Sequence, residues 1–431
     1  MPPISQSGSG LHAHLVQESS RLPIELCETI IDLIRPGDLD DWKTFPEESR
    51  ALRACALVCR AWRPRAQFNL WRAVVLRPRE RIVPEFTAAL RSNPDRLAPL
   101  VRRMRLHPLG AVVPLDFFMP TLPNLRALFM EGVEWIAFPL RASRMRMPLL
   151  ASLTELQFSR CTFRTVKDAF DIIWSCTSLT KVAVWKCTFS EDQEKITESD
   201  AARLCAARKR RPAACAKVRQ LKLAGHPFVH PCAPMGSVFG CAVTELEYTS
   251  RDVFSSLQSL SRILSSYGML QVLKITGFLL QEDPEKPVPP GIIPSLTAAL
   301  PNPAALRIMV IHVVSSYRCD EDTVAAICGQ EILNESGSPC LRNLLSGLTR
   351  LEVQLGSHLI KDNAWWFERM TGRIPSMRDV LEIDMTRSRA FGLYDENPRE
   401  HDRKRGLLPA PFYRETLFLS IRALGWNLPK P

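Results

Sequence analysis

The chain has 431 residues, of which 46% are hydrophobic and 23% are charged, and its formal net charge is +11. This composition is typical of a folded protein that exceeds one ordinary core, and it argues against a disordered or collagen-like chain. No stretch approaches the roughly 18 consecutive apolar residues of a membrane helix, and residues 1–20 lack the pattern of a secretory signal, so we expect no membrane partner, reduced cysteines and a location in the cytoplasm or nucleus.

Differences in residue pattern divide the chain into five predicted segments. Residues 1–20 are polar and are expected to form a disordered tail. Residues 21–76 show helical periodicity, and residues 77–96 are expected to form a linker or a first helix. Strand-like motifs alternate with helical patterns over residues 97–386, and residues 387–431 are expected to form a C-terminal cap or loop.

The first predicted helix begins near Leu22 and Pro23 and ends at Pro36–Gly37, because proline suits the first helical position and Pro-Gly stops a helix. Its apolar residues fall on two faces, with Ile24, Cys27, Ile31 and Ile34 on one and Leu26, Ile30 and Leu33 on the other. A segment of about 55 residues can cover only one such face, so the second face predicts a partner surface.

A second helix is expected from about Ser49 to Trp62, after an acidic loop, and a third short helix is expected to begin near Pro64. The three helices carry motifs that resemble the F-box. Residues 22–34 fit the pattern LPxELxxxIxxxL with Ile34 in place of the last leucine, residues 57–62 fit LVCxxW, and Leu70-Trp71 fits a downstream LW. The longer acidic insertion at about residues 37–49 is similar to that of F-boxes common in fungi. A generic three-helix bundle is the alternative interpretation.

The resemblance implies that two parts of the chain have different functions. F-box proteins are substrate receptors of SCF-type ubiquitin ligases, in which the box binds a Skp-type adaptor that is tied to a cullin scaffold. The remaining domain binds an as yet unknown protein substrate, and the chain supplies neither a catalytic residue nor a cofactor. The positions carried over as adaptor-facing or box-core residues are Leu22, Pro23, Ile24, Leu26, Ile30, Leu33, Leu57, Val58, Cys59, Trp62, Leu70 and Trp71.

Short strand motifs follow one template from about residue 97 onward: apolar, two spaces, apolar, one space, apolar. The clearest are Leu153-x-x-Leu156-x-Phe158 and Leu179-x-x-Val182-x-Val184. Because amphipathic helices lie between them at a period of about 25–28 residues, the pattern predicts a leucine-rich-repeat-like solenoid, or horseshoe, of irregular period. The expected fold class is therefore α+β overall, a small all-α F-box helical bundle followed by this α/β solenoid. A layered α/β domain of another type is the alternative.

The middle positions of these strands are expected to point away from the helices and to form a substrate face. This face mixes both charge signs with large apolar groups, which suits a protein surface better than a phosphate backbone. An inert, solvated sheet face is the alternative. The candidates are Arg105, Phe129, Gln157, Trp185, Lys222, Glu247, Lys274, Arg307 and Glu352.

No phosphate-binding loop, nucleophile elbow or HExxH zinc helix occurs in the sequence, so we predict no enzyme activity. A group of potential zinc ligands fits no known finger spacing, and no metal is predicted for it: Cys205, Cys215, His226, His230, Cys232 and Cys241. The basic run at residues 208–211 is interpreted as a solvated loop, a nuclear import signal or a nucleic-acid contact. A non-ligase scaffold and a nuclear, nucleic-acid-associated protein are therefore the alternative functions.

Overall fold

The computed structural model describes residues 23–34, 45–76, 82–107, 122–135, 151–190, 198–224, 235–250, 253–279, 291–315, 320–329, 339–355 and 363–384. The predicted tail at residues 1–20, the predicted C-terminal segment at 387–431 and Leu22 lie outside these ranges. The described residues divide into two compact units, of which the first ends at Trp71 and the second begins at Arg72.

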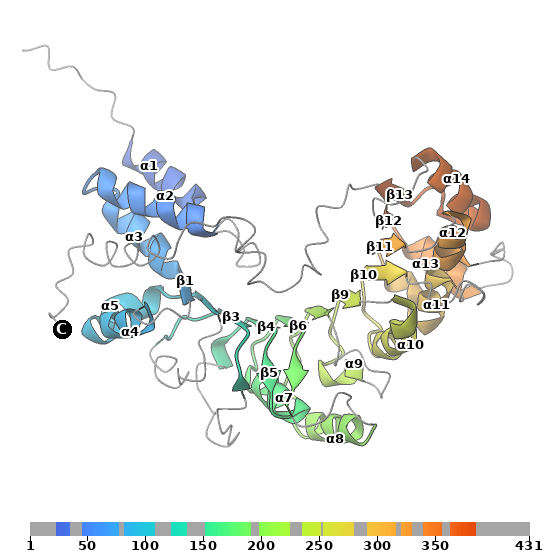
Figure 1. The fold of residues 1–431 in the computed structure, drawn as a ribbon, viewed down its shortest axis with the longest axis horizontal. Coiled ribbons are helices and arrows are strands. Elements are labelled where there is room, and N and C mark those ends of the chain that lie inside the picture. Colours follow the sequence, from blue (N-terminus) through green and yellow to red (C-terminus); the bar gives the residue numbers. More distant parts are fainter. Residues whose placement is uncertain are drawn as a thin grey trace, which may run out of the picture. The chain divides into compact units, whose positions relative to one another are not determined.

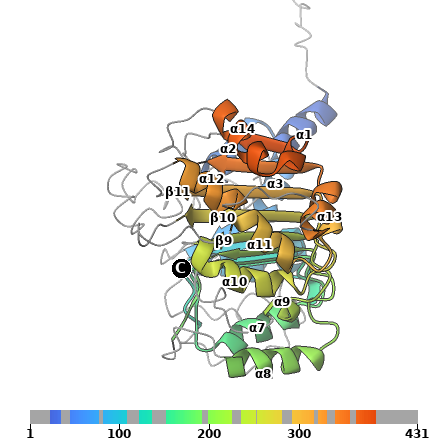
Figure 2. The same cartoon turned by 90° about the vertical axis from the view of Figure 1, so that its right-hand side faces the viewer.

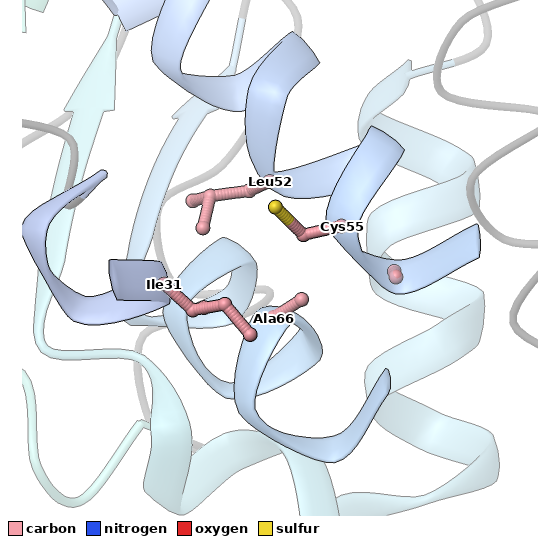
Figure 3. Close-up of a cluster of buried hydrophobic side chains, with 5 residues drawn as sticks. Ile31, Leu52, Cys55 and Ala66 are labelled. Atoms are coloured by element: carbon pink, nitrogen blue, oxygen red, sulfur yellow. The ribbon is translucent and has the colours of Figure 1, made fainter. Parts of the chain in front are cut away.

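The described part of the first unit contains three helices: α1 (Ile24–Leu33), α2 (Phe45–Val58) and α3 (Arg63–Arg72). Helix α1 begins directly after Pro23, as the sequence predicts. The three helices bury a small cluster made of Ile31, Leu52, Cys55, Ala56 and Ala66, against which Ile34, Trp62 and Leu70 pack. Side chains from all three helices point toward one another in this cluster (Figure 3).

The second unit is built on a parallel sheet (Figure 1). Eleven of the strands in the described part of the chain belong to this sheet, and each pairs with its neighbour in chain order. Two short strands, β5 (Thr162–Phe163) and β7 (Thr188–Phe189), form a separate parallel pair. The strands of the large sheet are β1 (Ala73–Leu76), β2 (Arg103–Leu106), β3 (Ala127–Glu131), β4 (Glu155–Ser159), β6 (Lys181–Trp185), β8 (Gln220–Ala224), β9 (Glu245–Ser250), β10 (Val272–Leu279), β11 (Ile308–Ser315), β12 (Arg350–Leu355) and β13 (Leu381–Asp384).

Helices and loops make the crossovers that parallel strands require. In Figure 2 the later helices cover one face of the sheet, and consecutive members such as α10 and α11 pack against each other. The helices of this unit are α4 (Ile82–Ser92), α5 (Pro94–Leu97), α7 (Val166–Ser175), α8 (Glu198–Lys209), α9 (Met235–Val238), α10 (Val253–Leu264), α11 (Ile292–Ala299), α12 (Asp320–Cys328), α13 (Pro339–Gly347) and α14 (Asn363–Arg373). Alternate strand residues, such as Leu156 and Phe158 of β4, are buried and form the core of the unit.

The predicted fold class, a small all-α F-box helical bundle followed by a leucine-rich-repeat-like solenoid, is wrong. The structure is α/β and is organised around the large all-parallel sheet. The sequence template was sensitive to local strand–helix alternation, and this alternation is common to every architecture made of βαβ crossovers. The motifs therefore located strands such as β4 and β6 correctly without determining how the strands assemble.

Close backbone approach between β10 and the end of β9 requires glycine at position 277. A Cβ atom there would lie within van der Waals overlap of the Ser250 carbonyl oxygen and 2.8 Å from Val253 Cγ2. We expect Gly277→Ala to lower the free energy of unfolding by about 1–3 kcal/mol, because the backbone oxygen cannot move aside cheaply. Urea denaturation monitored by circular dichroism measures the change.

Gly372→Ala is the matched control, because a Cβ atom at this position in α14 would meet nothing within 4 Å. Replacing glycine by alanine in a helix should raise stability by about 0.5–1 kcal/mol. Equal effects of the two substitutions would contradict the packing assigned to Gly277.

Candidate functional site

Exposed apolar side chains are concentrated on α1 and at the end of α2. Among the described residues, the large apolar side chains that are exposed are Ile24, Leu26, Ile30, Leu33, Leu57, Val58 and Met269. All of them except Met269 belong to these two helices, and we call these six residues the α1–α2 apolar surface. Leu33 is 81% exposed and Leu57 is 68% exposed. A concentration of exposed large apolar side chains on two helices is typical of an interaction site.

The two apolar faces of α1 have different environments. Cys27 and Ile31 are buried against the other two helices, whereas Leu26, Ile30 and Leu33 are exposed. The prediction that this helix carries more apolar surface than its own unit covers is thus confirmed. That a second protein covers the surplus stays a prediction.

A polar clamp fixes the buried face of α1 on α3. Arg65 Nε donates a hydrogen bond to Asp32 Oδ1 at 2.7 Å, and the Arg65 Nη2 group contacts Asp32 Oδ2. Asn69 Nδ2 donates to Asp32 Oδ1 at 3.0 Å and to the Ile31 carbonyl oxygen at 3.3 Å. The hydrogen bond with Asp32 raises the pKa of Arg65, so the guanidinium stays charged. The clamp orients α1 with its second apolar face open.

The other predicted adaptor residues divide between surface and core. Pro23 and Cys59 are exposed at the ends of α1 and α2. Trp62 and Leu70 are half-buried against the small core, and Trp71 is buried. The structure therefore brings the exposed members together on two helices and places the aromatic members where they support those helices.

Asp32→Ala should loosen α1 from α3, because it leaves Arg65 and the buried Asn69 amide without their carboxylate partner. We expect a loss of about 1–2 kcal/mol in local stability. Hydrogen exchange of α1 and α3 peptides measures this loss. Glu25→Ala, at an exposed position of the same helix, should change exchange by no more than about 0.5 kcal/mol. Equal protection in the two variants would refute the clamp.

The predicted substrate face corresponds largely to one row of residues across the sheet. Strand pairing places in register Arg105, Phe129, Gln157, Ala183, Lys222, Glu247, Lys274, Val310 and Glu352. We call these residues the central row. Trp185 lies two residues beyond Ala183 on β6 and is half-buried.

Arg307 lies outside the central row. It precedes β11, and its Nη1 group donates to the Gly347 carbonyl oxygen at 2.9 Å. Val310 takes the expected place because Met309 and Ile311, not Ile308, are the buried residues of this strand. The spacing Leu306-x-x-Met309-x-Ile311 fits the strand template and places Val310 in the middle position. The candidate Arg307 lies three residues earlier, and a shift by an odd number of residues exchanges the two faces.

Two candidates that were expected to be exposed are buried. Phe129 is 3% exposed and Arg105 is 7% exposed. Arg103 stacks over the Phe129 ring at 5.8 Å, and Arg105 Nη2 donates to Glu131 at 2.8 Å. The accessible part of the central row therefore extends from Gln157 to Glu352, with Ala183 as a buried member within it.

Charges of both signs alternate on this part of the sheet. Lys222 pairs with Glu247 at 3.0 Å, Lys274 with Glu245 at 3.3 Å, and Arg350 with Glu352 at 3.0 Å. Such pairs cancel much of the local potential, whereas a phosphate backbone requires a stripe of one sign. The described part of this face therefore carries paired charges and no stripe of one sign.

A partly buried ionic cluster lies at the β2–β3 end of the face. Glu131 accepts hydrogen bonds from Arg105 at 2.8 Å and lies 3.2 Å from His107 Nδ1. Burial alone would raise the pKa of Glu131, but the hydrogen bonds and charges of His107 and Arg105 outweigh it and lower the pKa to about 2. The ionised carboxylate thus stabilises the folded chain at neutral pH.

Glu131→Gln should destabilise the chain by about 2–3 kcal/mol at neutral pH, because it removes a carboxylate whose pKa is depressed on folding. The folded-state pKa is about 2 and the ordinary value is 4.5, so the stabilisation is complete above pH 4.5 and is lost as the pH falls toward 2. Melting temperatures of both proteins across this range provide the measurement. A difference that stays constant down to pH 2 would refute the assignment, and exposed Glu382→Gln serves as control.

The basic run at residues 208–211 is partly engaged within the chain. Arg211 Nη1 pairs with Asp171 at 2.8 Å, and the Arg211 guanidinium stacks over the Trp174 ring at 5.4 Å. Arg208 Nη1 donates to the Arg211 carbonyl oxygen at 2.8 Å. These contacts join the end of α8 to α7, which gives half of the run a structural role.

The potential zinc ligands do not come together in the described part of the chain. Cys215 is buried, which raises its pKa to about 12, whereas Cys241 is exposed. Cys205 lies 3.5 Å from the Ser237 hydroxyl. His226, His230 and Cys232 lie outside the described residues. Over the described ranges, no three histidine, cysteine or acidic side chains gather in a way that would hold a metal ion.

The chain matches no protein-family model and no curated protein. In the segments that the structure describes, none of the helices combines the length and the apolar run needed to cross a membrane.

Proposed function

We propose that this chain is the substrate-recognition subunit of an SCF-type ubiquitin ligase. In this proposal the α1–α2 apolar surface binds a Skp-type adaptor, and the sheet unit binds the protein to be ubiquitinated. The observation that carries the proposal is the exposure of six large apolar side chains on two helices that also bear the F-box-like motifs. Burying one such side chain yields about 1.5–3 kcal/mol, so an uncovered cluster of them favours association.

The proposed mechanism is proximity. An adaptor on α1 and α2 would connect the chain to a cullin scaffold and its charged ubiquitin carrier, while a target held by the second unit would present its lysines to that carrier. Holding both on one assembly raises their effective concentration, and the chain itself needs no nucleophile, acid or base. The location that fits this role is the cytoplasm or the nucleus.

The proposed target surface is the accessible part of the central row, from Gln157 to Glu352, together with Trp185. Its ion pairs and half-buried aromatic residue resemble the mixed composition of protein interfaces. The alternation of charge on this surface gives little support to a nucleic-acid ligand.

The double substitution Leu26→Glu and Leu57→Glu tests adaptor docking. Both side chains are exposed, so the fold should be retained, while two charges would enter the proposed interface. We expect the affinity for a Skp-type adaptor to fall by at least about 100-fold, as follows from losing roughly 3 kcal/mol of apolar burial. Isothermal titration calorimetry with the purified adaptor measures the change.

Met269→Glu is the matched control, because it places the same charge on an apolar side chain that is 57% exposed outside the α1–α2 apolar surface. It should leave adaptor affinity unchanged. Adaptor binding that survives the double substitution would reject the proposed function. Adaptor binding without co-purification of a cullin would reject the ligase role in favour of a scaffold.

A further inference from the structure

Three equivalent positions directly after β3, β4 and β6 have left-handed backbone conformations. Gly132, Arg160 and Lys186 have φ values of 61°, 53° and 47°. Each backbone N–H group donates to a carbonyl oxygen at the end of the next strand: Gly132 to Ser159 at 2.7 Å, Arg160 to Trp185 at 2.7 Å and Lys186 to Ala224 at 2.8 Å. The strand pairing therefore imposes this conformation at all three positions.

Glycine suits such a position, and arginine and lysine do not. Residues with a Cβ atom seldom adopt positive φ, and where they do they are mostly asparagine or aspartate. Arg160 and Lys186 are also neighbours of the same charge, an arrangement that destabilises adjacent strands. Burial, and then the charge of Arg160, lower the pKa of Lys186. Backbone strain and charge repulsion thus occur together at two residues that are neighbours on paired strands. Unfavourable contributions to stability of this kind are typical of functional sites.

The surroundings of the two cations suit a ligand. They follow Ser159 and Trp185 at the carboxyl ends of β4 and β6, and open α/β sheets place ligands at the carboxyl ends of their strands. Trp185 is half-buried and Arg160 is exposed. Thr162 and Thr188 follow on β5 and β7, and their hydroxyl oxygens lie 3.1 Å apart. Among the described residues, no carboxylate forms an ion pair with Arg160.

We propose that Arg160 and Lys186, with Trp185 beside them, form a binding site for oxyanions, which in a protein partner are the carboxylates of an acidic segment. An anion between the two cations removes their repulsion and makes charge-assisted hydrogen bonds to both. The Trp185 ring offers an apolar surface to the neighbouring part of the ligand. The ion pairs on the rest of the sheet disfavour extended nucleic acid. The site lies in the second unit and does not depend on adaptor docking.

Binding of a labelled oligoglutamate peptide to the full chain tests the site. Fluorescence anisotropy should show that Arg160→Gln combined with Lys186→Gln weakens binding by at least about tenfold. Lys209→Gln, which removes an exposed cation at the end of α8, should change affinity by less than about twofold. Equal affinity of the double variant and the native chain would overturn the proposal, as would the absence of peptide binding by the native chain.

Inorganic phosphate tests whether the site prefers a small free anion or the carboxylates of an acidic segment. An increase in melting temperature with phosphate, relative to chloride at the same ionic strength, together with peptide binding supports an oxyanion site that accepts carboxylates. Protection by phosphate without any peptide binding would overturn the assignment to an acidic segment. Binding of duplex DNA that is lost in the same double variant would also overturn it.

Substitution by glycine adds an independent signature. Arg160→Gly combined with Lys186→Gly should raise the melting temperature, because glycine tolerates positive φ, and should abolish peptide binding. A lowered melting temperature would contradict the strain on which the site rests. Adaptor affinity should be unchanged in both double variants, so that a failure of the oxyanion site is distinguished from a failure of the proposed function.

Discussion

Parallel pairing between consecutive strands is the constraint on which the second unit depends. Each strand must be followed by a crossover before the next can pair in the same direction, so the helices between strands are a consequence of the pairing. The pairing also fixes the register in which Gln157, Lys222, Glu247 and Lys274 form one row. The order of charges on this surface is therefore set by strand pairing, although the residues come from short segments that are far apart in the sequence.

The helical unit obeys a different constraint, which is the small size of its core. The buried cluster around Ile31 and Leu52 uses one face of α1, and the Asp32–Arg65 pair holds that face in place. Three short helices cannot enclose a second apolar face as well. Exposure of Leu26 and Leu33 therefore follows from the sequence itself.

The sequence predicted local features better than assembly, for a physical reason. Alternation of apolar and other residues over three positions is sufficient to locate β4 or β6. Two rows of apolar residues at helical spacing are sufficient to predict that one face of α1 is exposed. The arrangement of strand–helix units is decided by contacts between segments far apart in the chain, which the motifs do not record. The burial of Phe129 and Arg105 could not be predicted from the motifs either, because it depends on contacts with neighbours such as Arg103 and Glu131. The left-handed positions were missed even though the strand template aligns Arg160 and Lys186 with Gly132.

The two proposed sites share an energetic character. Exposed leucines on α1 lower solubility and add nothing to the core, and cations at positive φ are less stable than glycine in the same place. Other parts of the described chain follow local rules, with Thr165 and Asp168 forming a reciprocal cap on α7 and Gly277 fitting a close backbone approach, although Cys215 also has a positive φ. Departures from these rules in an otherwise consistent chain are expected where binding compensates for them. The exposed apolar residues of α1 are the basis of the proposed adaptor surface, and Arg160 and Lys186, which follow β4 and β6, are the basis of the proposed oxyanion site.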